Sequence, residues 1–418
     1  MVLVYFFYDL AVRLTGFLLH LPALFNQKIR QFLTGRQGVW EYLQTFRQPD
    51  KNLIWLHAAS LGEFEQGLPV LEHLQKEFPQ HQYLVTFFSP SGYEVKKGSM
   101  PGVGMTYLPL DTTSAAKRFI QLVKPEIALF VKYEVWPNLY RELHRAGIPN
   151  VMISTLFKPG QAYFKWYGGI MRAALKHVVY FYVQDERSAQ LLESLGFENH
   201  TVCGDTRFDR VLEILDRDNQ LDFMEYFKGK RSCLVAGSTW PEDETVLLPL
   251  LRELDPANSC AVMAPHAIQP HAIKKLQEKL GPGTICYSEI SGKGKDFLKN
   301  ARILVLDTIG ILTKVYSYAD LAYVGGGFAT GLHNTLEPAV FGIPVIIGPQ
   351  YSGFREAEQL VALGGIRVVE DPKAAHITLS EYLNSPEKRS ETGQINSEFI
   401  LKSKGASIQI AAGIRKYL

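Results

Sequence analysis

The fold of this chain is decided by the stretch Tyr323-Val324-Gly325-Gly326-Gly327-Phe328, by His333-Asn334-Thr335-Leu336-Glu337-Pro338-Ala339 and by Pro344-Val345-Ile346-Ile347-Gly348-Pro349. An apolar run, a glycine cluster, a polar helix start and a second apolar run follow one another, which predicts a strand, a loop, a helix and a strand. Glycines let backbone amides approach a ligand closely, and the first turn of a helix favours an anion. The stretch predicts a nucleotide-sugar site; an ordinary capped helix with a packed loop is the alternative.

The same alternation extends through the chain in both directions. Strands of a first parallel sheet are predicted at 53–57, 83–88, 127–131, 150–154, 178–183 and 201–203, and strands of a second sheet at 232–237, 261–264, 303–306, 321–324 and 345–347. Strands separated by helical stretches predict right-handed crossovers and a sheet covered on both faces. We therefore expect an α/β protein with two doubly wound halves facing across a cleft, in which ligands bind beyond the carboxyl ends of the strands.

Composition fits two ordinary folded domains. The chain has 418 residues, 46% of them hydrophobic and 21% charged, which is typical of globular proteins of this size. A formal net charge of +2 predicts no strong nucleic-acid binding. The four cysteines are far apart and form no CxxC pair, so reduced thiols are expected rather than disulfides or a zinc site.

The N-terminus departs from this pattern. Residues 2–25 are rich in Leu, Phe and Tyr, but Asp9, Arg13 and His20 interrupt the run. Charged residues are costly at the centre of a bilayer, and cations at 28, 30 and 36 follow the segment, which favours a helix lying in the membrane interface. A single transmembrane span and a buried helix of the first domain are the two alternatives. The predicted layout is a membrane-associated helix over 1–35, a first domain over 36–210, a linker over 211–231, a second domain over 232–400 and a final helix over 401–418.

Two carboxylates follow strands of the first predicted sheet. Glu63 comes after the first strand, within Ser60-Leu61-Gly62-Glu63, and Glu134 follows another strand end within Lys132-Tyr133-Glu134-Val135-Trp136. At the start of a helix we expect Glu63 to have a lowered pKa and to stay ionised, so that it could accept a proton from a substrate hydroxyl. The spacing from Ser60 to Glu63 is also that of a capping box, which gives Glu63 a purely structural alternative.

Seven motifs, taken in order, resemble the 3-deoxy-D-manno-octulosonic acid (Kdo) transferases of lipopolysaccharide synthesis. They are Ser60-Leu61-Gly62-Glu63, Glu134-Val135-Trp136-Pro137-Asn138, Gly204-Asp205-Thr206-Arg207-Phe208-Asp209, Ala236-Gly237-Ser238-Thr239-Trp240, Ala264-Pro265-His266, Asp307-Thr308-Ile309-Gly310 and His333-Asn334-Thr335-Leu336-Glu337-Pro338. Each motif alone is weak, and the specific signal is their joint order along nearly the whole chain.

The resemblance implies a GT-B fold, with the acceptor bound on the first domain, CMP-Kdo on the second, and the final helix crossing back to the first. It implies an inverting transferase of lipid A precursor at the cytoplasmic face of the bacterial inner membrane, with no cofactor, no metal and no nucleic-acid partner. Glu63 would be the general base, and Glu134 would hold the acceptor or support Glu63. The implied CMP-Kdo-binding residues are Ser238, Thr239, Pro265, His266, Gly310, Ile311, Leu312, Asn334, Thr335, Leu336 and Glu337.

Two positions depart from the family pattern. Many relatives have Arg where this chain has His266, which removes a fixed positive charge, and many have Glu where it has Ile311, which leaves only a backbone contact. Two other functions are kept open: a GT-B transferase that uses a UDP-sugar, and a membrane-associated protein that binds a sugar nucleotide without turnover.

Overall fold

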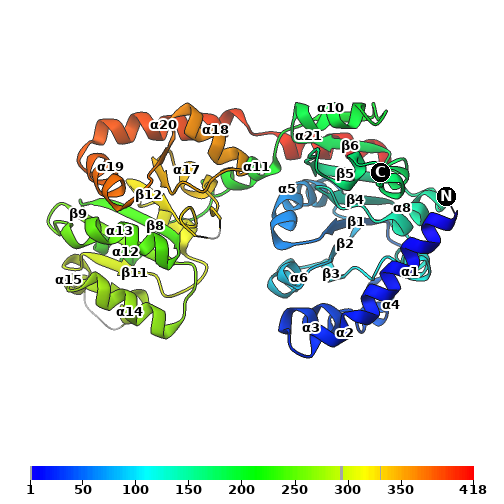
Figure 1. Ribbon diagram of the computed structural model, residues 1–418, viewed down its shortest axis with the longest axis horizontal. Helices are drawn as coiled ribbons and strands as arrows, with labels where there is room; N and C mark the ends of the chain where they lie inside the picture. Colours follow the sequence, from blue (N-terminus) through cyan, green and yellow to red (C-terminus); the bar gives the residue numbers. More distant parts are fainter. Residues whose placement is uncertain (1, 292–294, 330) are drawn as a thin grey trace. The chain divides into compact units, whose positions relative to one another are not determined.

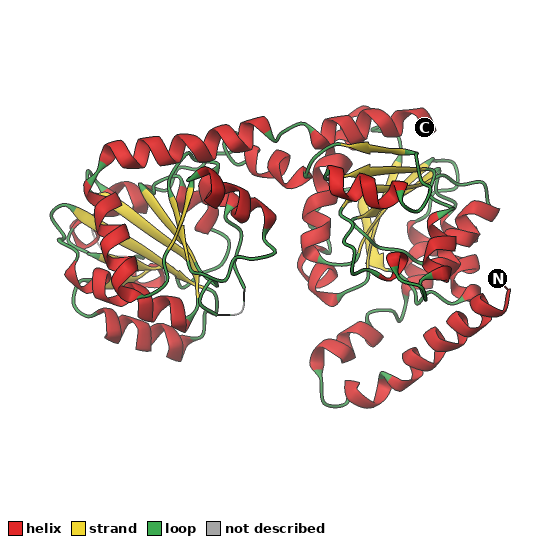
Figure 2. Cartoon of the chain, turned by 45° about the horizontal axis from the view of Figure 1, so that its top comes forward, coloured by secondary structure: helices red, strands yellow, loops and turns green. Residues whose placement is uncertain are grey.

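The computed structural model describes residues 2–291, 295–329 and 331–418. The chain divides into two compact units, Met1–Arg210 with Lys404–Leu418 as unit 1 and Val211–Ser403 as unit 2. Each unit is a parallel seven-stranded sheet with helices packed on both faces (Figures 1 and 2). The predicted α/β class with two Rossmann-like domains is confirmed.

Unit 1 contains a sheet with the strand order β3-β2-β1-β4-β5-β6-β7. Its strands are β1 (Leu53–Ala58), β2 (Gln82–Phe87), β3 (Val103–Tyr107), β4 (Ile127–Val131), β5 (Asn150–Thr155), β6 (Tyr180–Val183) and β7 (His200–Val202). Its helices are α1 (Val2–Leu18), α2 (His20–Ala23), α3 (Gln27–Thr34), α4 (Val39–Phe46), α5 (Leu61–Glu77), α6 (Pro90–Lys96), α7 (Thr113–Val123), α8 (Pro137–Arg145), α9 (Gly169–Leu175), α10 (Glu186–Glu193) and α21 (Ala406–Ile414).

Unit 2 repeats the arrangement with the strand order β10-β11-β9-β8-β12-β13-β14. Its strands are β8 (Ser232–Thr239), β9 (Ser259–Pro265), β10 (Thr284–Cys286), β11 (Ile303–Val305), β12 (Leu321–Val324), β13 (Val345–Ile347) and β14 (Ile366–Val368). Its helices are α12 (Asp222–Lys228), α13 (Pro241–Glu253), α14 (Pro270–Leu280), α15 (Lys295–Lys299), α16 (Leu312–Tyr316), α17 (Leu336–Ala339), α18 (Arg355–Leu363), α19 (Pro372–Asn384) and α20 (Pro386–Lys402), while α11 (Thr206–Leu212) holds the passage from unit 1.

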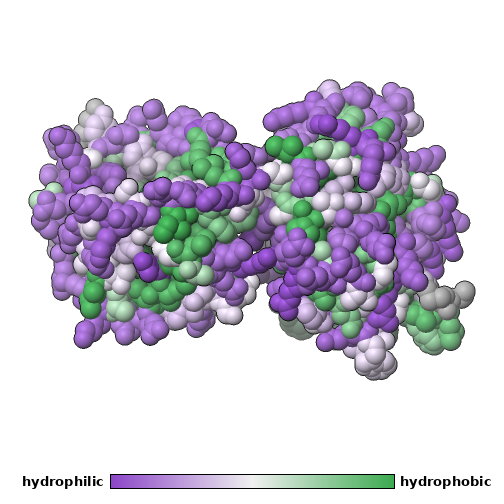
Figure 3. Space-filling view, turned by 90° about the horizontal axis from the view of Figure 1, so that it is seen from above, coloured by the Kyte–Doolittle hydropathy of each residue, from purple (hydrophilic) through white to green (hydrophobic). Residues whose placement is uncertain are grey.

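The central strands are apolar because each one is covered on both faces. In β1, Leu53 and Trp55 belong to one hydrophobic core, and Ile54 and Leu56 to the core on the other face, as expected from the two-residue period of a strand. Where the chain is exposed, hydrophilic surface surrounds small apolar patches on the face drawn in Figure 3. The sheet therefore acts as a rigid platform whose carboxyl ends carry the loops of interest.

Three strands were not predicted, and all three lie at sheet edges: β3 in unit 1, and β10 and β14 in unit 2. An edge strand has one neighbour and needs no continuous apolar run, so its sequence signal is weak. Gly104 interrupts β3 at the point where a Cβ would lie 2.4 Å from the Phe46 ring, so the glycine is required by close packing there.

The last helix, α21, is part of unit 1 and packs against α5. Asp209 caps it, because its carboxylate accepts hydrogen bonds from the amides of Gly405 (2.5 Å) and Ser407 (2.7 Å). At Gly413 a Cβ would lie 1.8 Å from the Tyr182 hydroxyl, so the helix lies almost in contact with the sheet. Unit 2 is consequently inserted in the sequence of unit 1.

The N-terminal helix α1 lies along the outside of unit 1 (Figure 1). A 21-residue segment, Leu3–Ala23, is long and apolar enough to cross a membrane, and only 11% of its most apolar window is buried. The alternative that this segment is a buried core helix is therefore wrong.

Candidate functional site

Glu63 lies in the first turn of α5, immediately beyond the carboxyl end of β1. Ser60 is the N-cap and its hydroxyl accepts a hydrogen bond from the Glu63 amide (3.4 Å), while the Ala59 amide donates to Glu63 Oε2 (2.5 Å). The residue is only 6% exposed. Burial raises the pKa of Glu63, opposed by the Ala59 amide and by the charge of Lys132. The prediction of a lowered pKa is wrong, because loss of hydration outweighs the helix terminus.

Glu134 lies in the loop between β4 and α8. The Tyr140 hydroxyl donates to the Glu134 carbonyl oxygen (2.5 Å), which holds the backbone of this loop against the helix that follows. Burial, followed by the charge of Glu63, raises the pKa of the Glu134 carboxyl to about 8. The two carboxyl groups are thus close enough to interact, and near neutral pH one of them carries a proton.

Backbone with positive φ occurs at a strand end in each unit. Lys132 follows β4 with φ 63°, and Ser238 lies near the end of β8 with φ 55°. Positive φ is uncommon outside glycine and is concentrated at functional sites. At Lys132 the strained residue contributes a charge that favours the ionised form of Glu63.

In unit 2 the glycine loop after β12 meets the end of β8 and the loop after β13 backbone to backbone. A Cβ on Gly325 would lie 2.3 Å from the Ser238 carbonyl oxygen, and a Cβ on Gly327 would lie 2.7 Å from Gly348. Glycine is therefore required at both positions, as the opening glycine cluster indicated. Ser238 and Thr239 lie at these close backbone contacts, and Thr239 is buried.

Asp243, in the first turn of α13, ties these loops together. Its carboxylate accepts hydrogen bonds from the amides of Trp240 (2.9 Å) and Gly326 (2.8 Å) and from the Tyr323 hydroxyl (2.8 Å). Asp243 was not among the residues predicted from the sequence. Its signal is an acidic residue three positions after Trp240, the spacing at which a carboxylate returns to the N-cap amide.

Two histidines and a tryptophan form one aromatic cluster at the same edge. The Trp240 ring stacks on His266, with centroids 4.5 Å apart, and His266 lies 4.6 Å from His333. Trp240 Nε1 donates to His333 Nε2 (3.1 Å), so that nitrogen carries no hydrogen. Burial, followed by the neighbouring His266, lowers the pKa of His333.

A cavity of about 240 Å³ opens beside His266, lined by Thr239, Pro265, His271 and Lys275 among others. Its volume suits a small polar ligand or part of one. The four predicted residues Ser238, Thr239, Pro265 and His266 are therefore neighbours at the carboxyl ends of β8 and β9.

Asn334 and Glu337 are tied to each other at α17. Asn334 Nδ2 donates to Glu337 Oε1 (3.0 Å), and the Thr313 hydroxyl on α16 donates to Glu337 Oε2 (2.9 Å). This places 334–337 beside the turn that holds Gly310, Ile311 and Leu312. Helix α17 has only four residues, so its dipole contributes less than the sequence analysis assumed, and side chains must carry the recognition.

The described residues include no group of three His, Cys, Asp or Glu side chains placed to hold a metal ion. Asp216 and Asp218 have the spacing of an Asp-x-Asp motif, which can bind a metal ion, but both are exposed in the segment between α11 and α12. Nothing in their placement connects them with the strand ends described above.

His57 is the second residue that the sequence analysis missed. It lies within β1, is fully buried, and points toward Glu134, with 3.9 Å between His57 Nε2 and Glu134 Oε2. Burial lowers the pKa of this imidazole to about 3, so the pair is no salt bridge at neutral pH. A single polar side chain in an otherwise apolar parallel strand was the available signal.

Two parallel sheets of this topology in one chain, each with its loops at the carboxyl ends, define a protein of the GT-B class. Among solved structures, the UDP-GlcNAc 2-epimerase from Neisseria meningitidis bound to UDP-GlcNAc matches with a TM-score of 0.62 at 15% identity, covering 87% of this chain and 100% of that one. MurG from Acinetobacter baumannii matches with a TM-score of 0.51 at 15% identity, covering 88% and 99%. At these identities the likeness concerns the fold alone.

Sequence comparison shows similarity to one family. Residues 34–210 match the family model described as 3-deoxy-D-manno-octulosonic-acid transferase (kdotransferase). The 3-deoxy-D-manno-octulosonic acid transferase of Haemophilus influenzae is 28% identical over 409 residues, covering 94% of this chain and 93% of that protein, and the one of Chlamydia pneumoniae is 28% identical over 417 residues, covering 96% and 93%. The chain is thus similar to Kdo transferases over nearly its whole length, and the resemblance predicted from its motifs is confirmed.

Proposed function

We propose that the protein transfers Kdo from CMP-Kdo to a hydroxyl of a lipid A precursor, with inversion at the anomeric carbon and with Glu63 as the general base. The observation that carries the proposal is a buried carboxyl with a raised pKa at the carboxyl end of β1, next to a second carboxyl whose pKa is about 8. A base is most effective when its pKa lies near the working pH, and burial moves Glu63 in that direction.

The proposed step is a single displacement. The acceptor hydroxyl gives its proton to Glu63 while its oxygen forms a bond to the anomeric carbon of Kdo. The bond from that carbon to the phosphate oxygen of CMP breaks, and CMP leaves with the electron pair. Positive charge developing at the anomeric carbon is offset by the sugar's own carboxylate, which lowers the demand on the protein.

Glu134 supports this step best as a neutral acid. Two adjacent carboxylates would raise the energy of the site if both were charged. Because the pKa of Glu134 is about 8, its proton remains in place at neutral pH, and Glu63 can be the member of the pair that ionises. A neutral Glu134 can then donate a hydrogen bond to the acceptor.

On the donor side, we assign the phosphate and the sugar to Ser238 and Thr239, and the cytidine to Pro265, His266 and the turn at 310–312. Glu337, already ordered by Thr313 and Asn334, suits the ribose hydroxyls. CMP is a monophosphate leaving group with less charge than a diphosphate, so hydroxyl and amide donors can stabilise it, and the proposed reaction uses no metal or cofactor.

The proposed partner of α1 is the membrane surface that carries the acceptor. Large apolar side chains point outward from α1 and the segment after it at helical spacing, namely Leu3, Phe6, Phe7, Leu10, Leu14, Phe17, Leu18, Leu21, Leu24 and Phe25, each of them at least half exposed. An apolar outer stripe of this kind is typical of a helix lying in the membrane interface.

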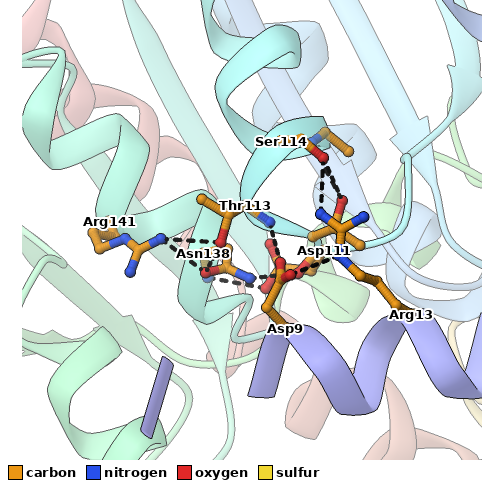
Figure 4. Close-up of polar contacts among 9 residues, drawn as sticks. Asp9, Arg13, Asp111, Thr113, Ser114, Asn138 and Arg141 are labelled. Carbon is orange, nitrogen blue, oxygen red and sulfur yellow. Dashed lines mark hydrogen bonds and ion pairs between the residues drawn. The ribbon is translucent and has the colours of Figure 1, made fainter. Parts of the chain in front are cut away.

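The inner face of α1 supports the same proposal, because its polar groups are used within unit 1 (Figure 4). Asp9 accepts a hydrogen bond from the Thr113 amide (2.5 Å), Arg13 donates to the Ser114 hydroxyl (3.1 Å), and the Tyr8 hydroxyl donates to Asp111 (2.9 Å). A transmembrane span would have to break these contacts. We therefore propose that the protein lies on the cytoplasmic face of the bacterial inner membrane.

The proposal is tested by mass spectrometry of a tetraacylated lipid A precursor after incubation with CMP-Kdo generated in the assay. Wild type should add whole Kdo units, and the linkage formed should have the opposite anomeric configuration to the donor by NMR. Glu63→Gln should abolish transfer, because the amide cannot take up the proton of the acceptor hydroxyl. The variant should still fold and bind CMP, since the amide oxygen can accept the hydrogen bond from Ala59 and the residues assigned to CMP lie in unit 2.

A matched control is Glu186→Gln, an exposed carboxylate on α10, which should leave the rate unchanged. Retention of more than a few per cent of the rate in Glu63→Gln would contradict the general base. Transfer from a UDP-sugar instead of CMP-Kdo would favour another GT-B enzyme, and CMP binding without any turnover would favour a protein that only binds sugar nucleotides.

A further inference from the structure

His57 occupies an unusual position behind the proposed acid–base pair. It is 0% exposed in the middle of the unit 1 sheet, and its ring packs against Phe130 and Trp136 at centroid distances of 5.6 and 5.8 Å. His57 Nδ1 lies 2.9 Å from the Thr86 hydroxyl oxygen, while Nε2 has no hydrogen-bond partner. A buried imidazole nitrogen without a hydrogen-bond partner costs free energy, so the group that Nε2 faces is important.

The neighbours of Thr86 favour one placement of the hydrogen on the His57 ring. Trp55 Nε1 lies 2.9 Å from the Thr86 hydroxyl oxygen, and an indole nitrogen can only donate. The Thr86 oxygen therefore accepts from Trp55, and the Thr86 hydroxyl can donate its own hydrogen to His57 Nδ1. A neutral imidazole that accepts at Nδ1 holds its hydrogen on Nε2.

This hydrogen faces the Glu134 carboxyl. The distance of 3.9 Å from Nε2 to Oε2 is about 1 Å longer than a hydrogen bond, and catalytic hydrogen bonds are often long before substrate binds. If Oε2 accepts from His57, the proton of a neutral Glu134 must be on Oε1. Glu134 would then present its own O–H away from β1 instead of toward it.

We propose that neutral His57, with its hydrogen on Nε2, is a positioning residue that fixes the orientation of the Glu134 carboxyl through the chain Trp55, Thr86, His57. The inference rests on the proposed function for its catalytic meaning, whereas the tautomer and the effect on Glu134 can be measured without any substrate. His57 itself touches no reacting atom and stays uncharged throughout.

The first test is NMR of the full-length protein labelled with ¹⁵N-histidine, with the His57 signals assigned by their loss in a variant. The expected result is a neutral imidazole protonated at Nε2 from pH 5 to pH 8. A hydrogen on Nδ1, or a charged ring in this range, would overturn the inference whether or not the protein transfers Kdo.

The second test compares two variants that each keep one half of the imidazole. In His57→Gln the amide nitrogen can reach the place of Nε2 and donate to Glu134, whereas in His57→Asn it reaches only the place of Nδ1 beside Thr86. Both lose the ring, so loss of packing affects them alike. Infrared titration of the protonated Glu134 band, assigned with Glu134→Gln, should give a midpoint about one to two pH units higher in His57→Asn than in wild type, and close to wild type in His57→Gln.

In the transfer assay His57→Asn should lower kcat by about 10- to 100-fold with little change in KM, and His57→Gln should recover most of that loss. Equal damage in both variants, with an unshifted Glu134 titration, would show that His57 only fills the core and would refute the positioning role. If wild type transfers nothing, the proposed function fails, while the NMR and infrared results still decide the present inference.

Discussion

Replacing Asp9 by alanine should loosen α1 from unit 1 without unfolding the sheet. The carboxylate of Asp9 accepts the amide hydrogen of Thr113, the first residue of α7, at 2.5 Å and pairs with Arg13 at 2.7 Å. The side chain is 17% exposed, and that of Arg13 is 52% exposed. The amide contact is therefore expected to matter more than the ion pair.

The expected magnitude follows from these two contacts. A hydrogen bond to a charged group contributes about 1.5–3 kcal/mol, and an ion pair as exposed as that with Arg13 contributes about 0–1 kcal/mol. A loss of about 2 kcal/mol would increase the detached population of α1 roughly 30-fold, since 1.4 kcal/mol corresponds to a factor of ten. Tyr8→Phe, which leaves the buried Asp111 without its hydroxyl partner, should have a similar effect.

Hydrogen exchange measures this directly in the full-length protein bound to lipid nanodiscs. Exchange at the Thr113 amide should accelerate by about the same 30-fold factor in Tyr8→Phe, which leaves its acceptor Asp9 in place, whereas amides of the central strand β4 should be unchanged. The exposed substitution Glu186→Ala on α10 is the control. If the Thr113 amide is already unprotected in wild type on lipid, α1 has left unit 1 to span the bilayer, and the docked orientation is refuted.

Three further predictions concern the two sets of strand ends. The transfer rate of wild type should fall above about pH 8, because Glu134 must keep its proton and its pKa is about 8; Glu134→Gln should remove this alkaline limb, and a limb that persists would contradict the neutral-acid role. His266→Ala should weaken CMP binding by about 1–3 kcal/mol in calorimetry, the range typical of aromatic rings that stack on bases, because His266 lines the cavity assigned to the cytidine; unchanged affinity would contradict that assignment. Gly325→Ala should cost about 1–3 kcal/mol in urea unfolding and weaken CMP binding, because its Cβ would lie 2.3 Å from the Ser238 carbonyl oxygen; wild-type stability would show that the loops can separate freely.

The sequence predicted the central strands because they are covered on both faces and are therefore continuously apolar. It also predicted that Glu63 and Glu134 would be neighbours, since parallel strands place their carboxyl ends at one edge. The edge strands β3, β10 and β14 escaped because packing on one side imposes a weaker pattern. The sign of the Glu63 pKa shift was wrong for a related reason: a local stretch reveals the helix terminus but not the burial imposed by segments far away in the sequence.

The orientation of α1 could not be predicted either. Asp9 and Arg13 seemed to interrupt an apolar helix, and only the structure shows that their partners, Thr113 and Ser114, lie about a hundred positions further along the chain. His57 escaped for the opposite reason, because one polar residue in a strand has many explanations until its two nitrogens are seen to face Thr86 and Glu134.

The capping of α21 by Asp209 has a consequence for biosynthesis. Because Lys404–Leu418 complete unit 1, the part of unit 1 that emerges first from the ribosome lacks α21 until these residues have been synthesised. At about 5–20 residues per second, synthesis of the intervening segment takes on the order of 10–40 s, during which the face of α5 that binds α21 stays uncovered. A chain that stops early therefore leaves unit 1 without α21 and leaves the face of α5 that α21 covers exposed to solvent.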